Sequence, residues 1–124
     1  MCITNYDFDI SKALTVLEAI RVEYICGQNS FICVAIFDYV TEHLRHSFKD
    51  ENEMYAFAEY VKSFLYKNKP TLKNKFKKYV EFDLWCGDDT DEVQWWYHFR
   101  NPTRSRMIRA NYLGDLIDSQ RKSK

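Results

Sequence analysis

The sequence DENEMYAFAEYVKSFL, which spans residues 50–65, decides the fold class of this chain. Its large apolar residues recur every three or four positions, and this spacing places them on one face of an α-helix. They are Met54, Phe57, Ala58, Val61, Phe64 and Leu65. Asp50 and Glu53 stand at capping-box spacing, at which two side chains accept hydrogen bonds from backbone N–H groups that the first helical turn leaves unpaired. The segment therefore predicts a helix that starts beside Asp50 and buries one face.

Two further helices are predicted before this segment. Apolar residues keep the same spacing after Asp9, and either Asp9 or Ser11 can cap the first of these helices. Gly27 can adopt the left-handed conformation that ends helices, and Ser30 can cap the next one, so the two helices are expected to form a tight hairpin. Residues 31–37 are apolar all round, which predicts that the second helix is the most buried element.

The periodicity is less regular after residue 65. Pro70 and Thr71 open a fourth helical segment, which we follow to about Val80. Val80, Phe82, Leu84 and Cys86 alternate with residues that include Glu81 and Asp83, so residues 80–86 are either helix or a short strand. Residues 93–99 are short and aromatic, and they fit either a short helix or an extended segment.

The last predicted helix runs from residue 103 to about residue 119, and residues 119–124 are expected to be a frayed tail. Its inward residues are expected to be Met107, Ile108, Tyr112, Leu116 and Ile117, and its outward residues Arg104, Arg106 and Arg109. Three glycines and two prolines are too few for a many-stranded β fold, which needs a turn every ~8 to 12 residues. We therefore predict one all-α (mainly α) domain over residues 1–124, a compact bundle of about five or six helices, with a short strand or extended segment after residue 80 left open.

Cysteine usage and the N-terminus indicate a cytoplasmic protein. The four cysteines are Cys2, Cys26, Cys33 and Cys86. Asp7 and Asp9 stand where a signal peptide would have a basic start and an apolar core, so we expect a reducing compartment and free thiols. The longest uncharged stretch, residues 24–37, is shorter than the ~18 apolar residues that a membrane span needs. No membrane association is predicted.

The charges cancel over the whole chain but are sorted along it. Residues 1–60 hold ten acids and four bases, and residues 61–80 hold seven lysines and no acid. Residues 81–95 hold six acids and no base, and residues 96–124 hold seven bases and two acids. Complementary charged patches steer encounters between proteins, and a neutral total does not oppose association. This arrangement favours a chain that docks onto a partner or onto another copy of itself.

Catalytic, metal and cofactor sites are not predicted. His43 and His46 lie three residues apart and leave a metal site open as an alternative, but a single close pair falls short of the two pairs typical of zinc sites. Asp88 and Asp89 follow Cys86 and disfavour its thiolate, which nucleophilic chemistry requires. The acidic loop has its glycine before the acids, unlike a calcium-binding EF-hand loop. We expect a protein that is not an enzyme.

A basic run is the strongest nucleic-acid signal. Its candidate phosphate contacts are Lys69, Lys73, Lys75, Lys77 and Lys78, extended by Arg104 and Arg106 if the last helix packs alongside. Phe76 and Tyr79, which could stack on bases, instead fall on the apolar face of the predicted helix. The acids from Glu81 onward would also repel phosphates. Nucleic-acid binding is therefore an alternative to a protein partner rather than the first expectation.

The run of five aromatic residues at 95–99 is too dense for one core to bury. Trp and Tyr near a surface commonly dominate the energy of protein interfaces. The predicted partner-binding residues are Trp95, Trp96, Tyr97 and Arg100, together with Asp88, Asp89 and Asp91 of the acidic loop. An aromatic pocket for a nucleotide or metabolite at the same place is a second alternative.

Two segments, EYICGQNSFICVAI at residues 23–36 and WWYHFRNPTRSRMIRANYLGDLI at residues 95–117, resemble short proteins encoded by bacteriophages and prophages. They cover about a third of the chain. The resemblance implies a phage origin, the cytoplasm of a bacterial host, and a protein that binds and modulates or inhibits a host macromolecule. We expect a host or phage protein as partner, with a homodimer left open.

Overall fold

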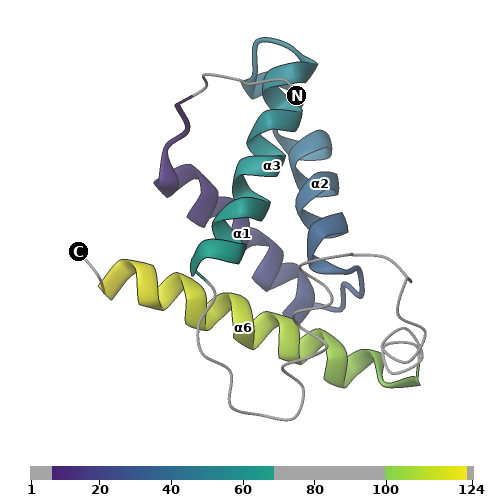
Figure 1. Ribbon diagram of the computed structural model, residues 1–124. Coiled ribbons are helices and arrows are strands. Elements are labelled where there is room, and N and C mark those ends of the chain that lie inside the picture. Colours follow the sequence, from purple (N-terminus) through teal and green to yellow (C-terminus); the bar gives the residue numbers. More distant parts are fainter. Residues whose placement is uncertain (1–6, 69–99, 123–124) are drawn as a thin grey trace.

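The structure, a computed structural model, describes residues 7–68 and 100–122 (Figure 1). The elements in chain order are α1 (Ile10–Ile25), α2 (Ile32–His43), the short 3-10 helix η1 (Arg45–Ser47), α3 (Glu51–Asn68) and α6 (Pro102–Lys122). These residues contain no strand, so the predicted all-α class is confirmed for them. They contain four α-helices, fewer than the five or six predicted. The predicted helix to Val80 and the undecided stretch after it lie outside the described residues.

Local signals set the first helix and the turn that follows it. Asp9 caps α1, because its Oδ1 accepts a hydrogen bond from the backbone N–H of Ser11 at 3.0 Å. Gly27 has a positive φ of 127°, as the predicted stop requires. The cap of α2 is Phe31, which makes no side-chain capping bond, so the prediction that Ser30 caps this helix was wrong.

The capping box before α3 is present. Asp50 Oδ1 accepts a hydrogen bond from the backbone N–H of Glu53 at 2.9 Å. Glu53 Oε1 accepts one from the backbone N–H of Lys49 at 2.8 Å. Asp50 thus satisfies a backbone donor of the first turn, and Glu53 reaches back to the backbone N–H of the residue before Asp50. The start of α3 is therefore the one that the sequence predicts.

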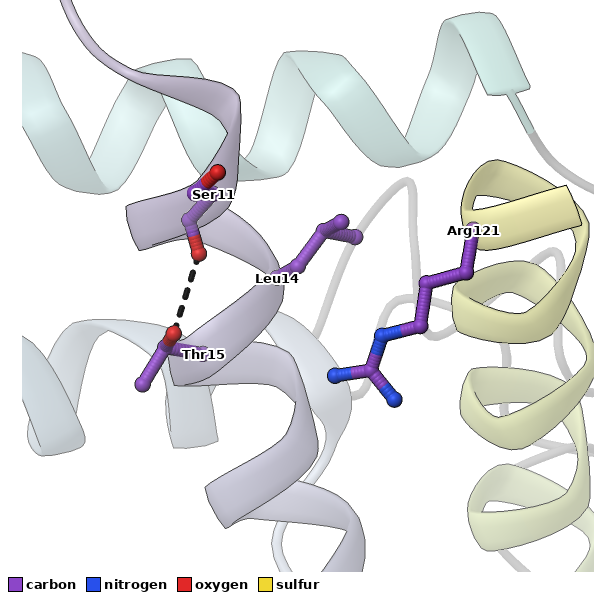
Figure 2. Close-up of a pocket in the computed structure, with 4 residues that line it drawn as sticks. All are labelled: Ser11, Leu14, Thr15 and Arg121. Atoms are coloured by element: carbon purple, nitrogen blue, oxygen red, sulfur yellow. Dashed lines mark hydrogen bonds between the residues drawn. The ribbon is translucent and has the colours of Figure 1, made fainter. Parts of the chain in front are cut away.

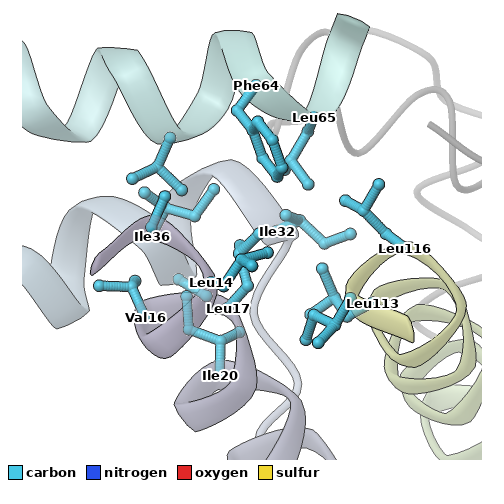
Figure 3. Close-up of a cluster of buried hydrophobic side chains, with 14 of the residues drawn as sticks. Leu14, Val16, Leu17, Ile20, Ile32, Ile36, Phe64, Leu65, Leu113 and Leu116 are labelled. Carbon is cyan, nitrogen blue, oxygen red and sulfur yellow. The ribbon is translucent and has the colours of Figure 1, made fainter. Parts of the chain in front are cut away.

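The helices pack in pairs around one core. α2 and α3 lie side by side and antiparallel, joined through η1, while α6 packs chiefly against α1 (Figure 1). Side chains from all four helices meet between them, as Figure 3 shows. They include Leu17 and Ile20 of α1, Ile32 and Ile36 of α2, Phe64 and Leu65 of α3, and Leu113 and Leu116 of α6. Burying each such side chain contributes about 1.5–3 kcal/mol, so this shared core holds the helices together.

The second helix is not buried all round. Ile32, Ala35, Ile36 and Val40 are buried, but the opposite side of α2 is exposed. The prediction that α2 is the most buried element was therefore wrong. Its neighbours α1 and α3 cover only one side of it, and the continuous apolar run leaves apolar side chains in solvent on the other.

The last helix differs from its prediction in three ways. It continues to Lys122, beyond the predicted end near residue 119. Met107, expected to point inward, is 36% exposed, and Arg109, expected to point outward, is 1% exposed. Arg109 is buried because its guanidinium reaches the carbonyl of Asn29 in the α1–α2 turn and the hydroxyl of Ser105 in α6.

None of the helices in the described ranges is both long and apolar enough to cross a lipid bilayer.

Candidate functional site

Among the residues that the structure describes, two exposed aromatic rings lie together on neighbouring helices. Phe37 of α2 and Tyr55 of α3 stack with ring centroids 5.6 Å apart and ring planes within 8° of parallel. Their side chains are nevertheless 46% and 42% exposed. Val34, one turn before Phe37, is 40% exposed. We call these three residues the Phe37–Tyr55 patch.

Helix periodicity explains why these side chains face solvent together. Val34 and Phe37 are three residues apart, so they share the side of α2 that lies opposite buried Ile36 and Val40. Tyr55 faces away from the core because its neighbours Met54 and Phe57 occupy it. The connection through η1 is short, which holds the two exposed sides next to each other.

The surroundings of the patch are mainly acidic. By helical spacing, Asp38 and Glu42 lie one and two turns after Val34 on α2, and Glu51 and Glu59 lie one turn on either side of Tyr55 on α3. Glu51 is paired with Arg45 at 3.5 Å, in an exposed contact. Within the described part of the chain, the other three carboxylates make no ion pair. Half-buried Lys62, two turns beyond Tyr55, is the base on this side of α3.

A second, smaller group of exposed apolar residues lies at the end of α1. Val22 and Ile25 are each about half exposed, and Cys26 beside them is an exposed free thiol. The partly exposed pair Arg21 and Glu18, joined at 2.9 Å, lies in the same part of α1.

A pocket of about 270 Å³ lies between the start of α1 and the end of α6 (Figure 2). It is lined by Ser11, Leu14, Thr15 and Arg121. The Thr15 hydroxyl donates to the backbone carbonyl of Ser11 at 3.0 Å, and the Arg121 guanidinium reaches from α6 toward α1. Ser11, Thr15 and Arg121 are all exposed, so solvent screens the single positive charge.

Arg109 is a buried cation that sequence reasoning placed on the surface. Its Nη1 donates to Ser105 Oγ at 2.6 Å, and its Nη2 donates to the carbonyl of Asn29 at 3.3 Å. The guanidinium carbon lies 5.1 Å from the ring centroid of Tyr24 and 5.9 Å from that of Phe31. These contacts tie α6 to the α1–α2 turn, so Arg109 is a structural residue rather than part of a phosphate-binding surface.

Most of the residues singled out in the sequence lie outside the described ranges. They are Asp88, Asp89, Asp91, Trp95, Trp96 and Tyr97 of the partner-binding set and Lys69, Lys73, Lys75, Lys77 and Lys78 of the basic run. Of the described ones, Arg100 and Arg104 are exposed and Arg106 is half-buried. His43 ends α2 with its ring centroid 4.6 Å from that of Tyr39, and His46 is in η1. No three metal-ligating side chains come together in residues 7–68 and 100–122.

The sequence places Phe37 at the end of the apolar run at residues 31–37, and that run was predicted to be buried in the core. A continuous apolar run such as residues 31–37 places apolar side chains on every side of a helix, more than one face can bury. The run alone does not show which of these side chains stay exposed. Tyr55 carried the clearer signal, because it sits among acids and falls off the apolar stripe of α3.

No known protein family, curated protein or solved structure matches the chain.

Proposed function

We propose that this chain is a non-enzymatic binding protein that engages another protein through the Phe37–Tyr55 patch. The supporting observation is that Phe37 and Tyr55 are stacked in a defined orientation and still nearly half exposed. Exposed apolar clusters usually mark interaction sites, and aromatic side chains often dominate interface energies. A ring that is already held in place also loses little conformational freedom on binding.

The partner we propose is a host or phage protein in the bacterial cytoplasm, and the effect is modulation or inhibition of its activity. This part of the proposal follows from the resemblance of residues 23–36 and 95–117 to short phage-encoded proteins. The aromatic run that includes Trp95, Trp96 and Tyr97 is proposed as a second contact region. A homodimer remains a competing arrangement.

Two other functions are weaker proposals. Exposed Arg104 and half-buried Arg106 support nucleic-acid binding, although Arg109 does not contribute to that surface. The pocket beside Arg121 would suit a small anionic ligand. Neither feature holds large apolar or aromatic side chains exposed side by side, as the Phe37–Tyr55 patch does.

Quantitative affinity capture from bacterial cells tests the proposed function. The Phe37→Ser/Tyr55→Ser double variant should recover at least tenfold less of the protein that the unmodified chain captures, because the two ring contacts are lost. Both substitutions are on exposed side chains, so circular dichroism should show an intact fold. Val22→Ser is the matched control, since Val22 is equally exposed but lies on α1. Equal capture by the double variant would contradict the proposal.

The alternatives have their own readouts. Fluorescence anisotropy with labelled single- and double-stranded oligonucleotides should show no salt-sensitive binding if the partner is a protein. Light scattering over a range of protein concentrations should show a monomer unless the partner is a second copy.

A further inference from the structure

We infer that the occupant of the Phe37–Tyr55 patch is a basic amphipathic helix of a partner protein. This helix would carry Lys or Arg residues on both sides of two or three large apolar side chains. The inference rests on the proposed function, because it names the chemistry of the segment that would bind at the same site. It is argued from the shape of the patch and from the charges around it.

The shape suits a helix laid along the patch. Two antiparallel helices, α2 and α3, present Val34, Phe37 and Tyr55 as an apolar strip. A bound helix offers anchors at positions i, i+3 or i+4, and i+7, which is the usual way in which an amphipathic helix contacts such a surface. Glu51 and Glu59 of α3 flank Tyr55 by one turn on each side, and eight residues of helix span roughly 12 Å. Two turns of a partner helix would therefore reach from one carboxylate to the other.

The charges select a basic partner. Asp38, Glu42 and Glu59 make no ion pair among the described residues, whereas the Arg45 charge is already paired with Glu51. A Lys or Arg of the partner would meet one of these carboxylates and could also lie against an aromatic ring, where a cation is attracted to the π face. An acidic helix or a nucleic acid would instead bring negative charges next to these carboxylates. Lys62, on the same side of α3, is half-buried and offers such a partner one positive charge.

Helix α6 does not neutralise this surface. The cations of α6 are Arg104, Arg106, Arg109, Arg121 and Lys122, against the acids Asp115 and Asp118. α6 packs chiefly on α1, whereas the patch lies on α2 and α3. Among the residues that the structure describes, the acidic surroundings of Phe37 and Tyr55 are thus not neutralised by α6, and a cationic partner would complement them.

Selection of peptides on the full-length chain tests the inference. The probe is a display library of sixteen-residue helical peptides, roughly four turns long, with randomised outward positions. Selected peptides should have net positive charge and apolar residues at helical spacing. They should bind at least tenfold more weakly to the Phe37→Ser/Tyr55→Ser variant, and severalfold more weakly to Asp38→Lys/Glu59→Lys. A second selection on Asp38→Lys/Glu59→Lys should enrich acidic peptides instead.

The control for the charge change is Asp115→Lys/Asp118→Lys, which makes the same reversal on exposed positions of α6. It should leave binding of the selected peptides unchanged. The inference is overturned if the enriched peptides are acidic or neutral, if none is enriched, or if their binding ignores Phe37 and Tyr55. It is also overturned if light scattering shows self-association that Asp38→Lys/Glu59→Lys abolishes, because the occupant would then be a second copy. In the first three cases, loss of cellular capture by Phe37→Ser/Tyr55→Ser would still support the proposed function.

Discussion

Arg109 shows how one buried side chain can join distant parts of a small helical protein. It lies 80 residues from Asn29, whose carbonyl it contacts, and it also contacts Ser105 one turn before it in α6. A guanidinium suits this position because its planar fork can donate to two acceptors while its face lies against aromatic rings. A buried charge is costly to desolvate, so these contacts offset that cost.

Arg109→Ala should lower the free energy of unfolding by roughly 2–4 kcal/mol, since it removes two hydrogen bonds from a charged group and leaves a cavity. Urea denaturation followed by circular dichroism measures this change. Arg109→Lys should recover only part of the loss, because an ammonium lacks the two-sided fork. Arg121→Ala removes an exposed arginine of the same helix and should change stability by no more than about 0.5 kcal/mol. Similar effects of the two alanine variants would show that Arg109 is not a tie between helices.

For the helices, local sequence signals were sufficient to predict where they start and stop. They were not sufficient to predict features that depend on contacts between distant residues. The caps of α1 and α3 and the positive φ of Gly27 depend on residues within one turn, so their positions could be predicted. The burial of Arg109 depends on a turn 80 residues away, and no local pattern encodes that contact. The exposure of Phe37 depends on which side of α2 its neighbours cover. Both were therefore predicted wrongly, although the segments that carry them were correctly predicted to be helices.

The start of α3 provides a test of such a local signal. Asp50→Ala should lower the free energy of unfolding by about 0.5–2 kcal/mol, because it leaves the backbone N–H of Glu53 without its acceptor. Thermal and urea denaturation should both report the loss. Asn52→Ala is a suitable control, since Asn52 is exposed in the same turn and alanine favours helices. A stability loss for Asn52→Ala as large as that for Asp50→Ala would argue against the capping contribution.

Across the whole molecule, the segment before α1 is joined to α3 by aromatic contacts. Phe8 packs on Phe57 and Tyr60, with ring centroids 5.2 Å and 5.4 Å away. Burial raises the pKa of Tyr60 above its usual value of 10.0, and the carboxylates of Asp9 and Asp7 raise it further. Ionisation of this phenol would place a negative charge in the contact between α3 and the segment before α1, close to the carboxylates of Asp7 and Asp9. The fold therefore favours the neutral form of Tyr60.

This linkage predicts how overall stability responds to alkaline pH. Below the usual tyrosine pKa of 10.0 the phenol is neutral in both states, so its contribution is fully present. As pH rises toward the higher pKa of the folded state, the unfolded chain ionises first and the free energy of unfolding falls. Tyr60→Phe keeps the ring but cannot ionise, so its stability should decline less over this range in urea titrations. Asp7→Asn removes one of the charges that raise the pKa and should give an intermediate decline. If Tyr60→Phe declined as steeply as the unmodified chain, the alkaline loss of stability would have to originate at other groups.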